Sequence, residues 1–195
     1  MIRHVILDIG GVLILKEYGF LYILQKKYKF RISMAEKLLI KLNKGSDTFG
    51  FDFFQYVKTF NKYIGSSLTF SQFQKMKFDN IVFNKELIKF CKKNKKIFKT
   101  SIFSDNGKFN VPYLKKYMHT SKWIYKQLYS CEYGVGKSSE DFFKILLKKL
   151  NAKPEECIYI DDVPEYVKRA KKFGMHTVCF QNNKQLFKQL EKLLK

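Results

Sequence analysis

The chain has 195 residues, of which 46% are hydrophobic and 17% aromatic, and it contains three prolines. At roughly 100–200 residues per domain, this length corresponds to one globular domain, or to one domain with a small insertion. The abundance of Phe, Tyr and Ile excludes a disordered chain, and no apolar run approaches the ~18 residues of a membrane span. Because the early Asp8 and the two glycines after it do not suit a signal peptide, we expect a cytoplasmic protein.

The formal net charge is +21, from 38 Lys and Arg side chains against 17 Asp and Glu. Such an excess attracts phosphate polymers and anionic membranes. Only three of the cations are arginines, although arginine is the side chain best suited to bidentate recognition of phosphates and bases. The lysines are spread along the whole chain, and AT-rich codons account for Lys, Phe, Tyr, Ile and Asn together. We therefore favour genomic base composition over nucleic-acid binding as the origin of the charge, and we expect no membrane partner.

The four cysteines lie far apart in the sequence and form no C-x-x-C pair. Zinc sites need closely spaced thiolates or imidazoles, and the three histidines do not supply them. We expect reduced thiols, with Cys157 and Cys179 as small core residues.

The first predicted element is a buried strand over residues 2–7, which ends at Asp8 and is followed by Gly10-Gly11. Residues 15–83 then show helical spacing without strand alternation. The natural breaks between these helices are Gly45-Ser46 and Gly65-Ser66-Ser67. We expect the aromatic residues of this region to lie in its core rather than to line a pocket; they are Phe49, Phe51, Phe53 and Phe54.

Strands alternate with helices in the rest of the chain. The predicted strands are 96–103, 123–129, 157–160 and 175–180. The predicted helices follow the cap residue Asn84, the S-x-x-D capping box that begins at Ser138, and Pro164, and the last helix covers 184–194. This alternation predicts an α/β fold, with a Rossmann-like parallel sheet sandwiched by helices.

Polar side chains follow four of the predicted strands. They are Asp8 after the first, Ser104 after the second, Lys137 after the third and Asp161-Asp162 after the fourth. Each alone is typical of an ordinary turn, cap or surface lysine. In a parallel sheet, however, ligands bind beyond the carboxyl ends of the strands, where these groups meet. Together the carboxylates, hydroxyl, amine and glycine amides can hold Mg²⁺ and a phosphoryl group at once.

This set resembles the haloacid dehalogenase (HAD) superfamily of phosphohydrolases, and in particular the small sugar-phosphate phosphatases and the phosphatase domain of soluble epoxide hydrolase. Residues 5–13, 100–106, 134–137 and 158–162 look like its four motifs in order, with Gly174-Met175 downstream of the last.

The resemblance covers residues 1–14 and about 84–195, which it implies to be a HAD-like catalytic core. Residues 15–83 would then be a small helical cap inserted after the first strand, where specificity is set. The implied substrate is a small phosphorylated metabolite that this cap selects, and neither the substrate nor the oligomeric state follows from the sequence.

The resemblance implies a nucleophile and a magnesium site. Asp8 would attack phosphorus and form an aspartyl-phosphate that water later hydrolyses. Mg²⁺ would be held by Asp8, by the backbone carbonyl of Gly10 and by Asp162, with Asp161 assisting through a water.

It also implies a phosphate-binding set. Two unit charges 4 Å apart interact by only ~1 kcal/mol in water but by ~4 kcal/mol at an effective dielectric of 20, so a carboxylate that approaches a phosphate needs cations nearby. Lys137 would supply positive charge beside the ion, and Ser104 with the amides of Gly11 and Asp105 would bind phosphoryl oxygens.

Four positions depart from the superfamily pattern. Gly10 replaces a second Asp that usually serves as general acid and base, a role that contributes about 10²–10⁴-fold. Asp105 stands where the subgroup usually has Asn, Ser138 stands where Pro is expected, and 163–165 (Val-Pro-Glu) stands where small or amide residues are commoner. We therefore expect slow turnover on an intact fold.

Two alternatives stay open. Residues 131–138 (CEYGVGKS) nearly match the phosphate-loop pattern G-x-x-x-x-G-K-[ST], but Cys131 stands at the position of its first glycine. The second is a catalytically weakened HAD-fold protein that binds RNA or an acidic protein partner through its lysine-rich surface.

Overall fold

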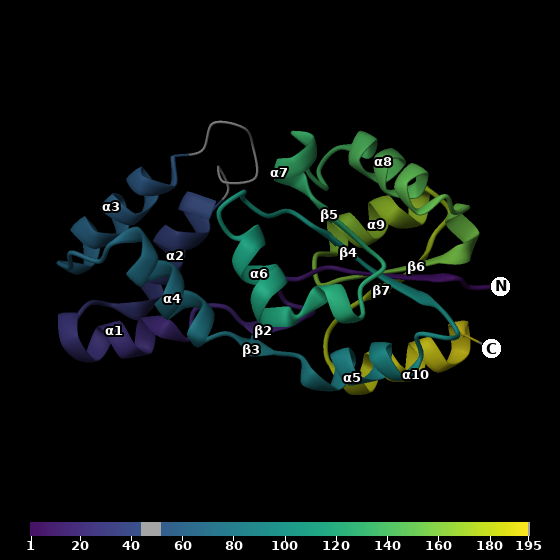
Figure 1. The fold of residues 1–195 in the computed structure, drawn as a ribbon, viewed down its shortest axis with the longest axis horizontal. Coiled ribbons are helices and arrows are strands. Elements are labelled where there is room, and N and C mark those ends of the chain that lie inside the picture. Colours follow the sequence, from purple (N-terminus) through teal and green to yellow (C-terminus); the bar gives the residue numbers. More distant parts are fainter. Residues whose placement is uncertain (44–51, 195) are drawn as a thin grey trace.

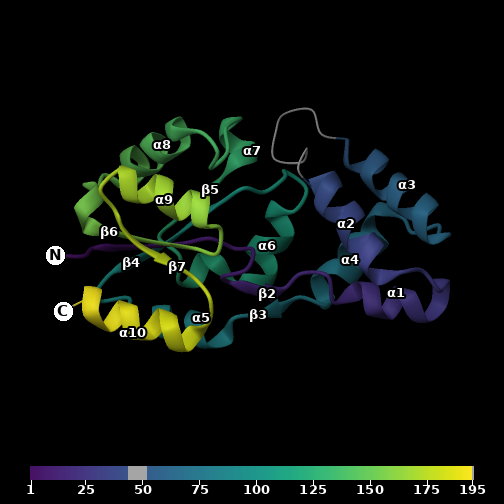
Figure 2. The same cartoon turned by 180° about the vertical axis from the view of Figure 1, so that it is seen from behind.

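The structure, a computed structural model, describes residues 1–43 and 52–194 and contains one five-stranded sheet in the order β5-β4-β1-β6-β7 (Figures 1 and 2). All neighbouring strands in this sheet are parallel, so their carboxyl ends lie at one edge. The strands are β1 (His4–Leu7), β4 (Lys99–Ser104), β5 (Lys126–Tyr129), β6 (Cys157–Asp161) and β7 (His176–Cys179). The predicted α/β sandwich is confirmed.

Helices cover both faces of this sheet. In Figure 1 α8 and α9 lie above it and α5 and α10 below, and Figure 2 shows the same layers from behind. The helices of this part are α5 (Lys85–Lys93), α6 (Val111–Met118), α7 (Ser130–Tyr133), α8 (Glu140–Leu150), α9 (Pro164–Lys172) and α10 (Asn183–Leu193), with 3-10 turns η1 (Thr120–Lys122) and η2 (Pro154–Glu156).

The alternating side chains of β1 divide between two hydrophobic cores. Val5 and Leu7 pack in the core that α5, α6 and α10 complete. Ile6 points the other way, into the core that contains Phe142 and Phe143 of α8. Because successive residues of a strand face opposite sides of the sheet, a strand buried on both faces is continuously apolar, as the sequence of β1 is.

Residues 14–83 form a separate group of elements, seen at the left of Figure 1. Its helices, α1 (Phe20–Tyr28), α2 (Ile32–Asn43), α3 (Phe53–Ile64) and α4 (Phe70–Asp79), share a core of their own that includes Phe20, Phe60 and Phe73. The expectation of helical structure throughout 15–83 is wrong at its two ends. There β2 (Ile14–Lys16) and β3 (Val82–Phe83) form an antiparallel pair, because the chain leaves and re-enters the main sheet region at the same place. Strands of two or three residues are too short to produce a periodic pattern.

The division into a core (1–14 and 84–195) and a cap (15–83) stays a prediction. Of the aromatic residues expected in the cap core, Phe53 is buried, whereas Phe54 is 68% exposed and the prediction for it is wrong. Phe54 neighbours Phe53 on α3, and adjacent helical residues point in different directions. Phe49, Phe51 and the break at Gly45-Ser46 lie outside the described residues.

Several predicted helix ends are confirmed. Asn84 accepts the N–H of Leu87 at the start of α5, and Pro164 is the first residue of α9. Gly65 and Gly174, which follow helices, have φ angles of +70° and +88°. The predicted capping box at Ser138 is wrong: α8 is capped by Ser139, whose Oγ accepts the N–H of Asp141 at 3.2 Å.

All four cysteines are free thiols; Cys91 and Cys157 are buried, whereas Cys131 and Cys179 are only half-buried. Among the described residues, none of the helices combines the length and apolarity that crossing a membrane requires.

Candidate active site

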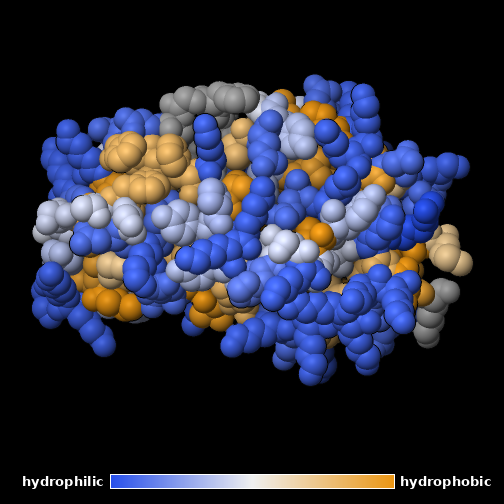
Figure 3. Space-filling model, viewed as in Figure 1, coloured by the Kyte–Doolittle hydropathy of each residue, from blue (hydrophilic) through white to orange (hydrophobic). Residues whose placement is uncertain are grey.

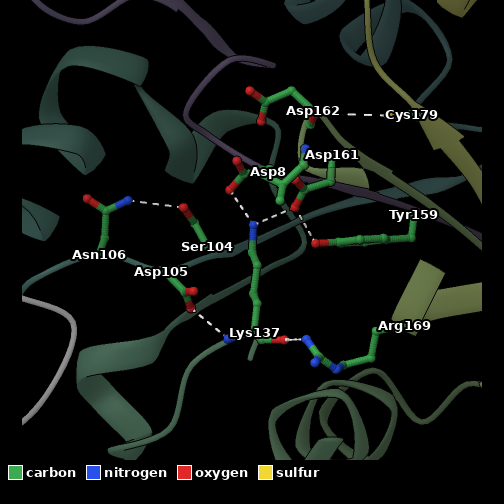
Figure 4. Close-up of polar contacts among 11 residues, drawn as sticks. Asp8, Ser104, Asp105, Asn106, Lys137, Tyr159, Asp161, Asp162, Arg169 and Cys179 are labelled. Carbon is green, nitrogen blue, oxygen red and sulfur yellow. Dashed lines mark hydrogen bonds and ion pairs between the residues drawn. The ribbon is translucent and has the colours of Figure 1, made fainter. Parts of the chain in front are cut away.

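The amine of Lys137 is the centre of a polar cluster at the carboxyl edge of the sheet (Figure 4). Its Nζ donates to Asp8 Oδ1 at 2.6 Å and to Asp161 Oδ2 at 2.7 Å. Asp8 follows β1 directly and Asp161 ends β6, and these two strands are parallel neighbours, so their ends bring both carboxylates to one place. Lys137 is 1% exposed, and a charge buried this deeply is stable only because it is paired.

The backbone of Lys137 is held from two sides. Its N–H donates to Asp105 Oδ1 at 2.9 Å, and its carbonyl oxygen accepts from Arg169 Nη1 at 2.6 Å. Asp105 belongs to the loop after β4, and Arg169 belongs to α9. Asp105 is one of the positions that depart from the superfamily pattern, because the subgroup usually has Asn there. In the structure this carboxylate instead binds the backbone of the loop that presents the lysine.

Both carboxylate oxygens of Asp161 accept hydrogen bonds. Oδ1 accepts the N–H of Val163 at 2.9 Å, and Oδ2 accepts from Lys137 and from the hydroxyl of Tyr159. The fully buried Tyr159 comes from β6, the same strand as Asp161. With both oxygens engaged, Asp161 is better placed to orient Lys137 than to coordinate an ion directly.

The carboxylates of Asp8, Asp161 and Asp162 each offer an oxygen, and these three atoms lie within 4.8 Å of one another. Hard oxygen ligands of this kind suit Mg²⁺. Lys137 occupies Oδ1 of Asp8 and Oδ2 of Asp161, so Asp8 Oδ2 and the Asp162 carboxylate are the ligand atoms that remain for a cation. The donor set therefore fits a small divalent ion.

The two glycines after Asp8 have different constraints. Gly11 has φ +71°, and a Cβ there would lie 2.2 Å from Asp162 Oδ2, so only glycine allows Asp162 to approach. Gly10 forms an isolated β-bridge with Ile14. Apart from its chain neighbours, the nearest heavy atom to a Cβ at position 10 is Asp8 Oδ2, at 4.0 Å. A Cβ at position 10 would therefore make only an ordinary van der Waals contact.

Ser104 lies at the end of β4, beside β1. Its Oγ accepts from Asn106 Nδ2 at 3.0 Å, and the N–H of Asn106 donates to Ser130 Oγ at 3.0 Å. These bonds fix the loop after β4 so that Ser104 lines the same cavity as Asp8 and Lys137.

Burial and charge change the pKa values in this cluster. Burial raises the pKa of Asp8 to about 7; the charge of Lys137 opposes this shift and the charge of Asp161 adds to it. Burial alone would lower the pKa of Lys137, but the negative charges of Asp8 and Asp161 raise it well above its usual value. Burial also raises the pKa of Asp105 and of Asp162. The lysine is thus firmly protonated. Because carboxylates outnumber cations in this cluster, the site favours the binding of either a proton or a metal cation.

A cavity of about 260 Å³ opens beside the cluster. Small-molecule sites typically measure ~300–1,000 Å³, so this cavity suits a small ligand. Its walls come from the loops after the strands, from residues 14–81 and from the region of α6 and α9. They consist of Asp8, Ile9, Gly10, Ile14, Glu17, Tyr18, Ile40, Lys77, Phe78, Ile81, Ser104, Asp105, Asn106, Asn110, Leu114, Lys137 and Tyr166.

The structure brings together the site residues that the sequence singled out, and it adds others. The predicted set of site residues lacks four that support or line the site, namely Tyr159, Arg169, Asn106 and Tyr166. Arg169 could have been singled out from the sequence, since it is one of only three arginines in the chain. The tyrosines could not, because the sequence contains 12 of them.

The phosphate-loop alternative does not fit the structure. Residues 130–133 form helix α7 instead of the end of a strand, and the side chain of Lys137 reaches back to Asp8 and Asp161.

Similarity to known proteins was found among solved structures and among curated sequences. No protein-family model matches the chain. A structure described as that of a predicted HAD-like family hydrolase from Porphyromonas gingivalis has a TM-score of 0.72 at 22% identity, over 100% of this chain and 98% of that one. A HAD family enzyme from Bacteroides thetaiotaomicron, crystallised with magnesium and inorganic phosphate, has a TM-score of 0.72 at 18% identity, over 96% and 100%. The chain has the HAD-like fold. The predicted resemblance is thereby confirmed.

Curated relatives match about a third of the chain. Bifunctional epoxide hydrolase 2 from Sus scrofa is 31% identical over 64 residues, which are 33% of this chain and 12% of that protein. Flavin mononucleotide hydrolase 1 from Arabidopsis thaliana is 39% identical over 64 residues (33% and 26%). Glyceraldehyde 3-phosphate phosphatase from Methanocaldococcus jannaschii is 41% identical over 61 residues (31% and 26%). The matches therefore span about a quarter or less of each relative.

Proposed function

We propose that this protein is a Mg²⁺-dependent phosphohydrolase that acts on a small phosphorylated metabolite through an aspartyl-phosphate at Asp8. The observation that carries the proposal is the buried contact of Lys137 with both Asp8 and Asp161, next to Asp162, beside a small cavity that Asp8 and Lys137 line. The fold supports the same activity, since HAD-like neighbours include an enzyme crystallised with magnesium and phosphate and a HAD phosphatase from Thermococcus onnurineus.

Asp8 and Asp162 would hold the ion, together with the backbone carbonyl of Gly10, while Asp161 orients Lys137. When bound, Mg²⁺ supplies positive charge that draws the phosphoryl group toward the Asp8 carboxylate and stabilises charge on its oxygens. Lys137 adds a second, fixed positive charge that needs no reorganisation during the reaction, because Asp105 and Arg169 hold its backbone.

In the first step, an Asp8 carboxylate oxygen attacks phosphorus, and the bond from phosphorus to the leaving oxygen breaks. Ser104 and the amides of Gly11 and Asp105 would donate hydrogen bonds to the phosphoryl oxygens. In the second step, water attacks phosphorus, which releases inorganic phosphate and restores Asp8.

The leaving oxygen needs a proton, and Gly10 has no side chain to supply it. We expect that solvent supplies it, which slows the reaction for poor leaving groups by about 10²–10⁴-fold. Aryl and acyl phosphates, whose leaving groups need little protonation, should therefore react far faster than alkyl phosphates.

The test is hydrolysis of p-nitrophenyl phosphate by the purified chain with and without Mg²⁺. We expect Mg²⁺-dependent turnover that Asp8→Asn abolishes. Asp141→Asn is a matched control, because the Asp141 side chain is 67% exposed on α8, where it pairs with Lys144. Undiminished turnover by Asp8→Asn, or none by the wild type, would contradict the proposal.

A further inference from the structure

The cavity has a second charged pair, formed by Lys77 and Glu17. Lys77 Nζ lies 2.8 Å from Glu17 Oε1, and the side chains are 5% and 34% exposed. Lys77 belongs to α4, whereas Glu17 follows β2, 60 residues earlier in the chain. Both side chains line the cavity that also contains Asp8 and Lys137.

The surroundings of this pair are mainly apolar. Of the described residues that residues 15–83 contribute to the cavity wall, Glu17 and Lys77 are the charged ones, and the others are Tyr18, Ile40, Phe78 and Ile81. Burying the Lys77 ammonium among apolar neighbours costs desolvation energy that its ion pair with the half-buried Glu17 offsets, so the net stabilising value of the pair for the fold is small. Because both side chains line the cavity, the donors and acceptors that the pair leaves unused are close to any ligand bound there.

We propose that Glu17 and Lys77 recognise hydroxyl groups on the organic part of the substrate, which makes a neutral, hydroxylated monophosphate the preferred class. This inference rests on the phosphatase proposed above. A hydroxyl both donates and accepts, so it can donate to the Glu17 carboxylate while it accepts from the Lys77 ammonium. Hydrogen bonds to charged partners of this kind are among the stronger ones.

The charge balance disfavours a second anionic group on the substrate. Lys77 and Lys137 are the cations among the described residues of the cavity wall, and both are already paired with carboxylates. A carboxylate or second phosphate near Lys77 would have to displace Glu17 or lie beside it, and like charges repel. Substrates with an additional negative charge should therefore bind less tightly.

The size of the preference follows from the state of the empty site. When the polar groups of a site stay unpaired unless the correct ligand is bound, the site discriminates against an analogue that lacks the matching group by about 10⁴-fold or more. Here Glu17 and Lys77 satisfy each other when no hydroxyl is bound, so the discrimination is smaller. We expect about tenfold, which matches a net gain of one hydrogen bond to a charged group.

Three ligands with three carbons each test this proposal: glycerol 3-phosphate, n-propyl phosphate, which lacks the hydroxyls, and 3-phosphoglycerate, which replaces one hydroxymethyl group by a carboxylate. Each is measured as an inhibitor of p-nitrophenyl phosphate hydrolysis, with inorganic phosphate as the reference. Because inhibition needs binding and not turnover, the missing acid at Gly10 does not affect the comparison. We expect glycerol 3-phosphate to bind about tenfold more tightly than either of the other two.

Lys77→Met should remove this preference when the inhibition constant of each organic phosphate is expressed relative to that of inorganic phosphate in the same variant. Lys75→Met is the matched control, because Lys75 lies on the same helix, is 73% exposed and pairs with Asp79, away from the cavity wall. Glu17→Gln, which keeps the shape of its side chain, serves as the second variant if Lys77→Met does not fold. Of the three organic phosphates, only glycerol 3-phosphate should inhibit this variant less strongly than it inhibits the wild type.

The outcomes separate the two proposals. If phosphate and all three organic phosphates inhibit equally, or if the preference survives in both variants, hydroxyl recognition is wrong and the phosphatase stands. If 3-phosphoglycerate binds most tightly, Lys77 recognises an anion and the assigned class is wrong. If the wild type neither hydrolyses p-nitrophenyl phosphate nor binds inorganic phosphate, both proposals fail.

Discussion

At the scale of single residues, the two consecutive glycines after Asp8 have opposite tolerances. Gly10 has room for a Cβ, whereas a Cβ at Gly11 would overlap the Asp162 carboxylate. In the HAD superfamily that the sequence resembles, the position of Gly10 usually carries the acid that protonates the leaving group. The structure therefore offers a direct way to add or remove one catalytic function at a time.

Gly10→Asp should raise turnover of alkyl phosphates about 10²–10⁴-fold more than that of p-nitrophenyl phosphate, because a base at this position assists the water attack that both substrates share, whereas only the alkoxide also needs the proton. The measurement is kcat on both substrates with Mg²⁺. Gly10→Asn is the control, since it has the same shape without an acidic proton. Equal alkyl phosphate rates for the Asp and Asn variants would show that the proton comes from elsewhere.

Gly11→Ala should weaken Mg²⁺ binding, because its Cβ would overlap the Asp162 carboxylate and displace it. The left-handed backbone adds a stability cost of about 1–2 kcal/mol. Gly65→Ala isolates that cost, since Gly65 has φ +70° with no atom within 4 Å of an added Cβ. Mg²⁺ titration and urea unfolding of both variants are the measurements. A Mg²⁺ affinity that falls equally in both, or in neither, would contradict the placement of Asp162.

At the scale of elements, the site is formed by loops that hold one another. Lys137 is not on a helix or a strand, and its position depends on Asp105 after β4 and on Arg169 of α9. A loop fixed by bonds from two separate elements can present a buried amine with the accuracy that an electrostatic role requires.

Arg169→Met should lower kcat about tenfold with a smaller change in KM, because it removes a bond that positions Lys137 without touching the substrate. Lys168→Met, its exposed neighbour on α9, is the control. Steady-state kinetics on p-nitrophenyl phosphate separate the two parameters. A loss confined to KM would instead place Arg169 in substrate binding.

Much of this arrangement could be predicted from the sequence, because buried parallel strands are continuously apolar and their polar ends are recognisable. Asp8, Ser104 and Asp161 each follow such a run. The pair of β2 and β3 is too short to leave a pattern. The residues that position Lys137, such as Tyr159 and Arg169, act through tertiary contacts between elements that are distant in the chain, and no local spacing encodes them.

At the scale of the whole molecule, the positive charge is spread over the surface. The part of Figure 3 that corresponds to α5 and α10 is strongly hydrophilic, and both helices expose several lysines. Their inner sides pack through Phe90 and Phe187, whose ring centroids are 5.2 Å apart. Binding of RNA or an acidic protein by this surface stays a prediction, and steep salt dependence would be its signature.

Stability should depend on pH and Mg²⁺ together. A carboxyl group whose pKa is higher in the folded state, as burial makes that of Asp8, stabilises the fold at low pH, and this contribution is lost as the pH rises from 3.8 through about 7. Relative to Asp8→Asn, the metal-free wild type should lose up to about 4 kcal/mol of unfolding free energy over that range.

Because Mg²⁺ and a proton compete for Asp8, the stabilisation by Mg²⁺ should be larger at about pH 8 than at about pH 5.5. Urea unfolding with and without Mg²⁺ at both pH values measures it. A Mg²⁺ effect that is greater at the lower pH would have the wrong sign for a site that contains Asp8.

The central claim is that the Asp8 carboxylate forms a covalent bond to phosphorus. Borohydride reduces an acyl phosphate but not a free carboxylate, so quenching the enzyme with borohydride during turnover of p-nitrophenyl phosphate should convert Asp8 to homoserine. Peptide mass spectrometry detects this change. We predict homoserine at position 8 only when both substrate and Mg²⁺ are present, whereas an unmodified Asp8 during demonstrable steady turnover, or reduction at another carboxylate, would contradict the account.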